Sequence, residues 1–114
     1  MAEQLDMSLL NELRDLMDGE FSVLLDVYIR ESERQFHEAN EAWETGDMDR
    51  LGRSAHSLKG ASCNIGAVQL ADYCAELESA AKQRLETRVP EMLNKVTLEL
   101  REVRDAVYAV RLSC

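Results

Sequence analysis

The stretch "VPEMLNKVTLELREVRDAVYAV", residues 89–110, carries apolar residues at alternating intervals of four and three. This spacing is typical of a helix that presents one apolar seam to its neighbours in a bundle. Pro90 falls in the first turn, where its missing N–H breaks no hydrogen bond. The stretch therefore predicts a long bundle helix. Its seam consists of Val89, Leu93, Val96, Leu100, Val103, Val107 and Val110.

Residues that start and stop helices divide the rest of the chain. Asp6 or Ser8 can cap a short first helix that ends before the first glycine. Gly46 is placed to end a long helix, and Asp47 to cap the next one, which Gly66 then ends. The longer helices predicted in this way cover about residues 20–45, 47–64 and 67–85.

The connections between the long helices are short, which makes sequential neighbours antiparallel. The predicted fold class is therefore all-α: an antiparallel up-down-up-down four-helix bundle with a short additional N-terminal helix. Neither an internal repeat nor a linker interrupts the pattern. We expect residues 1–114 to form a single helical bundle domain.

Composition and charge exclude several function classes. The chain has 114 residues, of which 46% are hydrophobic and 31% charged, the balance of a soluble globular protein. A net charge of -9 argues against nucleic acid or an anionic membrane as partner. Residues 1–10 lack the pattern of a secretory signal. Three cysteines cannot all pair within one chain, so we expect free thiols and a cytoplasmic location.

A histidine on an open helix face is the most distinctive feature of residues 47–64. At about 100° per residue, the apolar side chains of this helix cluster in one direction, which must face the core. His56 lies about 140° from that direction and is expected to face solvent. Gly52 and Gly60 stand four residues before and after it, although a helix-interior glycine costs about 1 kcal/mol relative to alanine. This pattern predicts a histidine that a bulky partner can reach.

Such a histidine suits phosphoryl transfer. A neutral imidazole has a nitrogen lone pair that can take up a phosphoryl group. In-line attack needs space around that nitrogen, which bulky side chains one turn away would obstruct. Lys59, three residues after His56, can hold phosphoryl oxygens through charge-assisted hydrogen bonds. We find no glycine-rich phosphate loop and no kinase motif, so ATP is not the expected donor.

Three motifs follow one another in the middle of the chain: "AHSLKGAS" (55–62), "NIGA" (64–67) and "LADYCAELE" (70–78). Together they resemble the signature of histidine-containing phosphotransfer (HPt) domains, the relay proteins of multistep two-component signalling, in their free-standing bacterial type. The helical plan of the whole chain is similar to the plan of that family.

The resemblance implies a role for each matching residue. His56 matches the phosphorylated histidine, which is modified on Nε2. Lys59 matches the lysine that steadies the phosphoryl group, and Gly60 matches the small residue that leaves room for the partner. Glu78 matches a Gln or Glu that hydrogen-bonds the other ring nitrogen. A carboxylate there favours the protonated, non-nucleophilic ring, but it also stabilises the charge that develops during attack. The sequence leaves that balance open.

The resemblance also implies partners. His56 would accept a phosphoryl group from a receiver-domain aspartate of a hybrid sensor kinase and pass it to a response regulator. The aspartate and its Mg²⁺ would belong to the partner, and this chain would need no cofactor and no metal. We expect a monomeric phosphoryl carrier rather than a true enzyme, without kinase activity of its own.

Contact with a receiver needs a surface around the histidine. Gly52, Arg53 and Cys63 are predicted to lie on it, with Arg50 nearby, because all four fall near the exposed face of the helix. Simple solvation is an equal alternative for both arginines. The leucines of the first helix either meet a partner or close the end of the bundle. His37 has a glutamate four residues away on each side and is expected to be solvated and idle.

Two other function classes make different demands on the sequence. A di-iron carboxylate enzyme needs Glu-x-x-His pairs, but arginine stands three residues before each histidine. A metal site formed by Cys63, Cys74 and a histidine has poor spacing, so no metal site is predicted. A helical adaptor or interaction module that is never phosphorylated stays open as the alternative. Such a module would tolerate the loss of His56.

Overall fold

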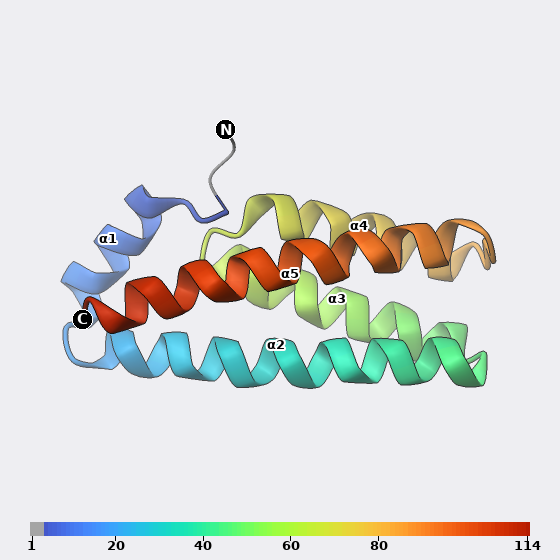
Figure 1. Ribbon diagram of the computed structural model, residues 1–114, viewed down its shortest axis with the longest axis horizontal. Helices are drawn as coiled ribbons and strands as arrows, with labels where there is room; N and C mark the ends of the chain where they lie inside the picture. The colour runs from blue at the N-terminus through green and yellow to red at the C-terminus, as the bar shows by residue number, and fades with distance from the viewer. Residues whose placement is uncertain (1–3) are drawn as a thin grey trace.

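The computed structural model describes residues 4–114, and this part of the chain contains five helices and no strand (Figure 1). The predicted all-α class is confirmed. The predicted domain, residues 1–114, includes three residues outside the described part. No helix within residues 4–114 combines the length and the apolar character needed to cross a membrane. The helices are α1 (Met7–Met17), α2 (Glu20–Thr45), α3 (Met48–Asn64), α4 (Val68–Lys82) and α5 (Arg88–Leu112).

The helix boundaries follow residues that satisfy the free backbone groups at helix ends. The Asp6 carboxylate accepts a hydrogen bond of 3.2 Å from a backbone N–H in the first turn of α1. Asp47 caps α3 in the same way, at 3.0 Å from the backbone N–H of Arg50. Gly46 ends α2 with a φ of +75°, a left-handed conformation that favours glycine. The bounds predicted for α2 and the cap predicted for α3 are confirmed.

The end of α4 differs from the prediction. The helix ends at Lys82, not at Leu85, because Arg84 adopts a left-handed φ of +55°. The backbone N–H of Leu85 then donates to the carbonyl of Ala80 at 3.0 Å and closes the turn. Glycine usually marks such a turn. None is present here, so the sequence carried no sign of it.

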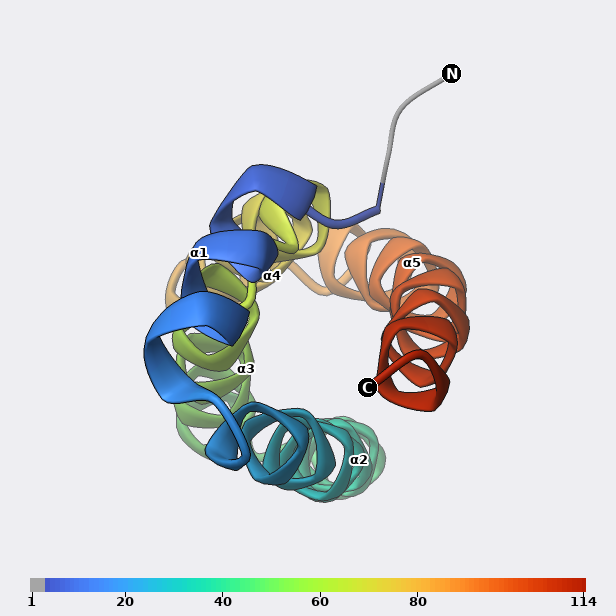
Figure 2. The ribbon, with the colours of Figure 1, turned by 90° about the vertical axis from the view of Figure 1, so that its left-hand side faces the viewer.

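Helices α2 to α5 lie lengthwise beside one another, and each runs opposite to the one before it (Figures 1 and 2). The helix α1 lies across one end of this arrangement. The seam predicted for α5 is buried, with Val89, Val96, Val103 and Val107 fully shielded from solvent. Burial of apolar side chains from all five helices into one core holds the fold together.

A glycine fixes the start of α1 against the turn between α3 and α4. Gly66 has a φ of +76°, and a Cβ on it would lie 2.8 Å from the Cβ of Asp6. The backbone N–H of Asp6 donates to the Gly66 carbonyl at 2.9 Å. Within α1, Leu10 is completely buried whereas the side chain of Leu16 is 83% exposed. The first helix therefore closes the bundle end with Leu10 and the partly buried Leu13, and leaves Leu16 in solvent.

Candidate functional site

His56 projects into solvent from the middle of α3, with 65% of its side chain exposed. Leu51, Ala55 and Leu58 of the same helix are almost completely buried. The helix thus packs one face on the core and leaves the imidazole on another. The exposure of His56 predicted from periodicity is confirmed.

Glu78 of α4 holds the imidazole from the neighbouring helix. Its side chain is only 11% exposed, and its Oε2 and Oε1 atoms lie 3.1 and 3.3 Å from Nδ1 of His56. A carboxylate can only accept hydrogen bonds, so Nδ1 carries the proton and donates it to Glu78. In the neutral ring, this contact leaves the lone pair on the other nitrogen, Nε2.

Two lysines share the same carboxylate. Nζ of Lys59 lies 3.2 Å from Oε1 of Glu78, and Nζ of Lys82 lies 3.1 Å from Oε2. Burial is the largest influence on this carboxyl group and raises its pKa. Hydrogen bonds from Lys82, Lys59 and His56 together outweigh it, so the pKa of Glu78 lies below its usual range. Glu78 is therefore an ionised, nearly buried anion that binds three donors.

Sequence reasoning missed Lys82. It stands four residues after Glu78 on α4, at the spacing that brings two helical side chains together. That spacing was the only signal available, and it becomes informative once Glu78 is known to contact His56.

The two glycines beside His56 have different surroundings. Gly60 is exposed, and a Cβ on it would meet nothing within 4 Å. Gly52 is buried, and a Cβ on it would lie 3.9 Å from Ala81 of α4. Gly52 is thus not exposed as predicted, although it does line one of the grooves beside His56. A residue four positions away lies about 40° further round the helix, which turns Gly52 toward α4 and Gly60 away from it.

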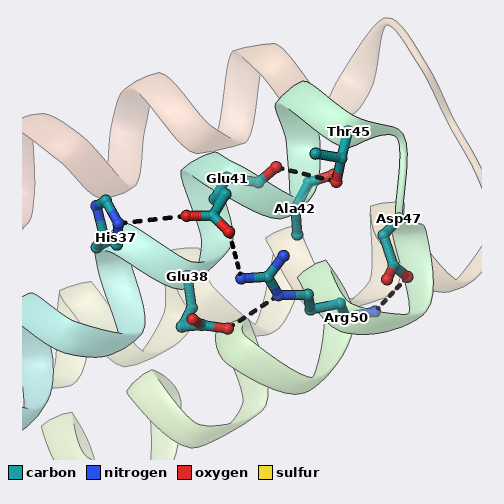
Figure 3. A network of polar contacts seen from close by, with 7 residues as sticks. All are labelled: His37, Glu38, Glu41, Ala42, Thr45, Asp47 and Arg50. Carbon is teal, nitrogen blue, oxygen red and sulfur yellow. Dashed lines mark hydrogen bonds and ion pairs between the residues drawn. The ribbon is translucent and has the colours of Figure 1, made fainter.

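The two arginines of α3 also differ. Arg53 is exposed and forms no ion pair within residues 4–114. Arg50 points the other way, toward α2, where it donates to Glu38 at 2.9 Å and to Glu41 at 3.0 Å (Figure 3). Arg50 is therefore not simply solvated, because these ion pairs join α2 to α3.

His37 is exposed and has one contact with a charged side chain. Its Nε2 atom lies 3.4 Å from Oε2 of Glu41, one turn further along α2, and Glu41 also binds Arg50 (Figure 3). The side chain of His37 is 77% exposed, so the solvated ring predicted from the sequence is confirmed. The ring belongs to the surface network that joins α2 to α3.

The cysteines occupy different environments. Cys63 is exposed on α3, as predicted, and Cys74 is buried. Burial raises the pKa of the Cys74 thiol to about 12, which keeps it protonated and unreactive. Within residues 4–114, no group of three or more His, Cys, Asp or Glu side chains lies close enough to hold a metal ion.

Two shallow grooves meet at His56. One, of about 620 Å³, is lined by residues that include Gly52, Arg53 and Ser57. The other, of about 530 Å³, runs past Lys59. Both are lined by His56, Glu78 and Lys82, so these three residues form the centre of the site.

This arrangement can carry out nucleophilic attack on an electrophile that another molecule supplies. The Nε2 lone pair is exposed, a fixed anion faces the opposite side of the ring, and two ammonium groups lie beside that anion. The charges suit a reaction that leaves a cationic ring bearing an anionic group.

Comparisons with known proteins agree with this chemistry. A family model described as the Hpt domain matches residues 23–111. The crystal structure of histidine-containing phosphotransfer protein B (HptB) from Pseudomonas aeruginosa PAO1 is 36% identical in sequence, and the match covers 100% of this chain and 99% of that one with a TM-score of 0.94. The HPT domain of the Hpt sensor hybrid histidine kinase from Shewanella is 24% identical. That match covers 97% of this chain and 96% of the domain with a TM-score of 0.74, a likeness of fold. No curated protein matched the sequence.

Proposed function

We propose that His56 is the phosphoryl-accepting residue of this chain, which belongs to the Hpt domain family and has a histidine phosphotransfer role in phosphorelay signalling. One observation supports this assignment above the others: Nδ1 of His56 is held by the nearly buried Glu78 while the rest of the ring is exposed. The contact fixes the tautomer in which Nε2 is the nucleophile.

The donor is the phosphorylated aspartate in the receiver domain of a hybrid sensor kinase. The Nε2 lone pair attacks the phosphorus, an N–P bond forms, and the P–O bond to the aspartate breaks. The electron pair of that bond stays on the aspartate carboxylate. The Nδ1 proton stays in place, so the phosphorylated ring is a cation that faces Glu78. The reverse step on the receiver of a response regulator passes the phosphoryl group on.

Neighbouring residues have distinct roles in this proposal. Lys59 binds the phosphoryl oxygens, and Glu78 orients the ring and stabilises its positive charge. Gly60 leaves room for the receiver because its surroundings are open. Arg53 and Cys63 lie on the exposed surface that the receiver meets, with Arg53 facing acidic groups of the partner.

The scaffold is proposed to be one domain over residues 1–114, an up-down-up-down four-helix bundle to which α1 is added at one end. It would act as a monomer, with the Mg²⁺ of the reaction bound in the partner's receiver domain. A cytoplasmic location is proposed because three free cysteines suit a reducing compartment.

A transfer assay tests the proposal. Wild type and His56→Gln are each incubated with a receiver domain that carries radiolabelled phosphate. We expect label on wild type only, stable in alkali and lost in acid as for a phosphoramidate. Label on His56→Gln would show that another residue accepts the group. Absence of label on both, across several receivers, would favour the helical adaptor that carries no phosphate.

A further inference from the structure

Lys82 occupies an unusual position beside the phosphoryl-accepting ring. Two of the three lysines in the chain bind the same carboxylate, that of Glu78. Lys82 binds Oε2, the oxygen that also lies 3.1 Å from Nδ1 of His56. The ammonium group and the ring that the proposed reaction modifies therefore contact the same carboxylate oxygen.

Lys82 is also much more exposed than Lys59. The side chain of Lys82 is 71% exposed and that of Lys59 is 33% exposed. Lys82 is the last residue of α4 and lines both grooves that meet at His56. A long, exposed lysine at this place can leave its carboxylate without disturbing the packing of the helix.

The charge distribution of the site changes when His56 is phosphorylated. In the resting protein, the single negative charge of Glu78 is shared by three donors. A phosphoryl group adds about 1.5 to 2 negative charges, on oxygens that need donors of their own. The ring, now cationic, keeps its contact with Glu78. The cationic ring then balances the charge of Glu78 without the help of two lysines, whereas the phosphoryl oxygens require charged donors.

Resting on the proposed function, we propose that Lys82 exchanges partners in the reaction: it binds Glu78 in the resting protein and the phosphoryl oxygens in the phosphorylated one. It is thus a second phosphoryl-binding lysine, supplied by α4, beside Lys59 of α3. The exchange moves an ammonium group only, and no bond or proton is transferred to or from Lys82. Its consequence is a longer-lived phosphohistidine and an equilibrium shifted toward the phosphorylated chain.

The test compares Lys82→Gln with Lys95→Gln. The control removes the chain's third lysine, which lies over the ring of Tyr73 and away from His56, and it changes the net charge equally. Two quantities are measured: the half-life of the isolated phosphohistidine and the equilibrium between a phosphorylated receiver and the chain. We expect both to fall about three- to tenfold for Lys82→Gln, and Lys95→Gln to match wild type. Lys82→Arg should retain most of the effect.

A second background separates direct binding from an indirect effect through Glu78. In Glu78→Gln, the side chain still accepts from Nδ1 but no longer holds a charge for Lys82 to neutralise. If Lys82 binds the phosphoryl group, Lys82→Gln lowers both quantities in this background too. If the effect disappears there, Lys82 acts only on Glu78 and the proposal is overturned.

Failure of this proposal differs from failure of the proposed function. If Lys82→Gln has the half-life and equilibrium of wild type, the partner exchange of Lys82 is refuted, but the phosphorylation of His56 is not. If wild type itself takes up no label, the proposed phosphotransfer function is refuted. Including His56→Gln in the same series shows which of the two proposals has failed.

Discussion

The two histidines of this chain are both exposed on helices, and a glutamate contacts each. The two glutamates differ in the helix they come from, in their burial and in the ring nitrogen they contact. The glutamate beside His56 comes from another helix, is 11% exposed and binds Nδ1. The glutamate beside His37 comes from the same helix, is 48% exposed and binds Nε2. The first contact holds the ring and leaves Nε2 free, whereas the second lies on Nε2 itself, at 3.4 Å.

The cations differ in the same way. Near His56, two lysines bind the glutamate and lie beside grooves that a partner can enter. Near His37, Arg50 binds the glutamate and is itself held by Glu38 (Figure 3). Exposure of a histidine is therefore not enough to make a reaction site. We propose that a fixed partner on the inner nitrogen, an open outer nitrogen and nearby lysines are needed together.

The largest expected effect separates the two histidines. His56→Gln should abolish phosphoryl acceptance, whereas His37→Gln should leave it unchanged. In His56→Gln/Glu41→Ala, Nε2 of His37 is freed, but the protein should stay unlabelled because no fixed carboxylate holds Nδ1. Labelling from a phosphorylated receiver measures all three. Label on His37 in the double variant would show that freeing the nitrogen is sufficient.

The glycines sharpen the distinction between open and packed surroundings. Gly60→Leu should slow transfer about 10- to 100-fold by obstructing the receiver, with the fold retained because the space is empty. Gly52→Leu should instead lower the free energy of unfolding by about 1–3 kcal/mol: its Cβ would be in ordinary contact with Ala81, and the atoms beyond the Cβ would crowd α4. Transfer rates and denaturant unfolding measure the two effects. Unchanged transfer by Gly60→Leu would contradict the role given to that position.

The pH dependence of stability tests the buried carboxylate. Because the pKa of Glu78 is lower in the folded chain, its contribution is fully present above the pKa of an unfolded glutamate, about 4.3, and is lost as pH falls through the folded value. The difference in melting temperature between wild type and Glu78→Gln should therefore shrink below about pH 4.

Glu44→Gln, which removes an exposed negative charge, is the matched control for this pH series. A difference between wild type and Glu78→Gln that stayed constant down to pH 3 would show that the ionised carboxylate is not stabilised by its three donors.

The smallest effect is expected for the network around His37. Arg50→Gln breaks the ion pairs to Glu38 and Glu41, but exposed pairs contribute little. We expect a melting temperature lower by a few degrees at most and unchanged phosphoryl transfer. Slower transfer by Arg50→Gln would place this residue at the docking surface after all.

Local rules predicted those parts of the fold and site that depend on neighbours in sequence. Asp47 and Gly46 mark helix ends because capping and left-handed turns involve only adjacent residues. The exposure of His56 follows from helical periodicity, and Glu78 was assigned through the family resemblance. The end of α4 was missed because Arg84 forms its turn without a glycine.

The sequence by itself determined the order of the helices, which of their faces are apolar and that one histidine faces solvent with a glycine after it. Only the tertiary structure decided the rest: that Gly52 packs on Ala81, that Arg50 binds α2, and that Lys82 joins Lys59 on Glu78. The reason is geometric. Periodicity gives the angle of a side chain about its own helix, but which neighbour lies at that angle depends on how the helices pack.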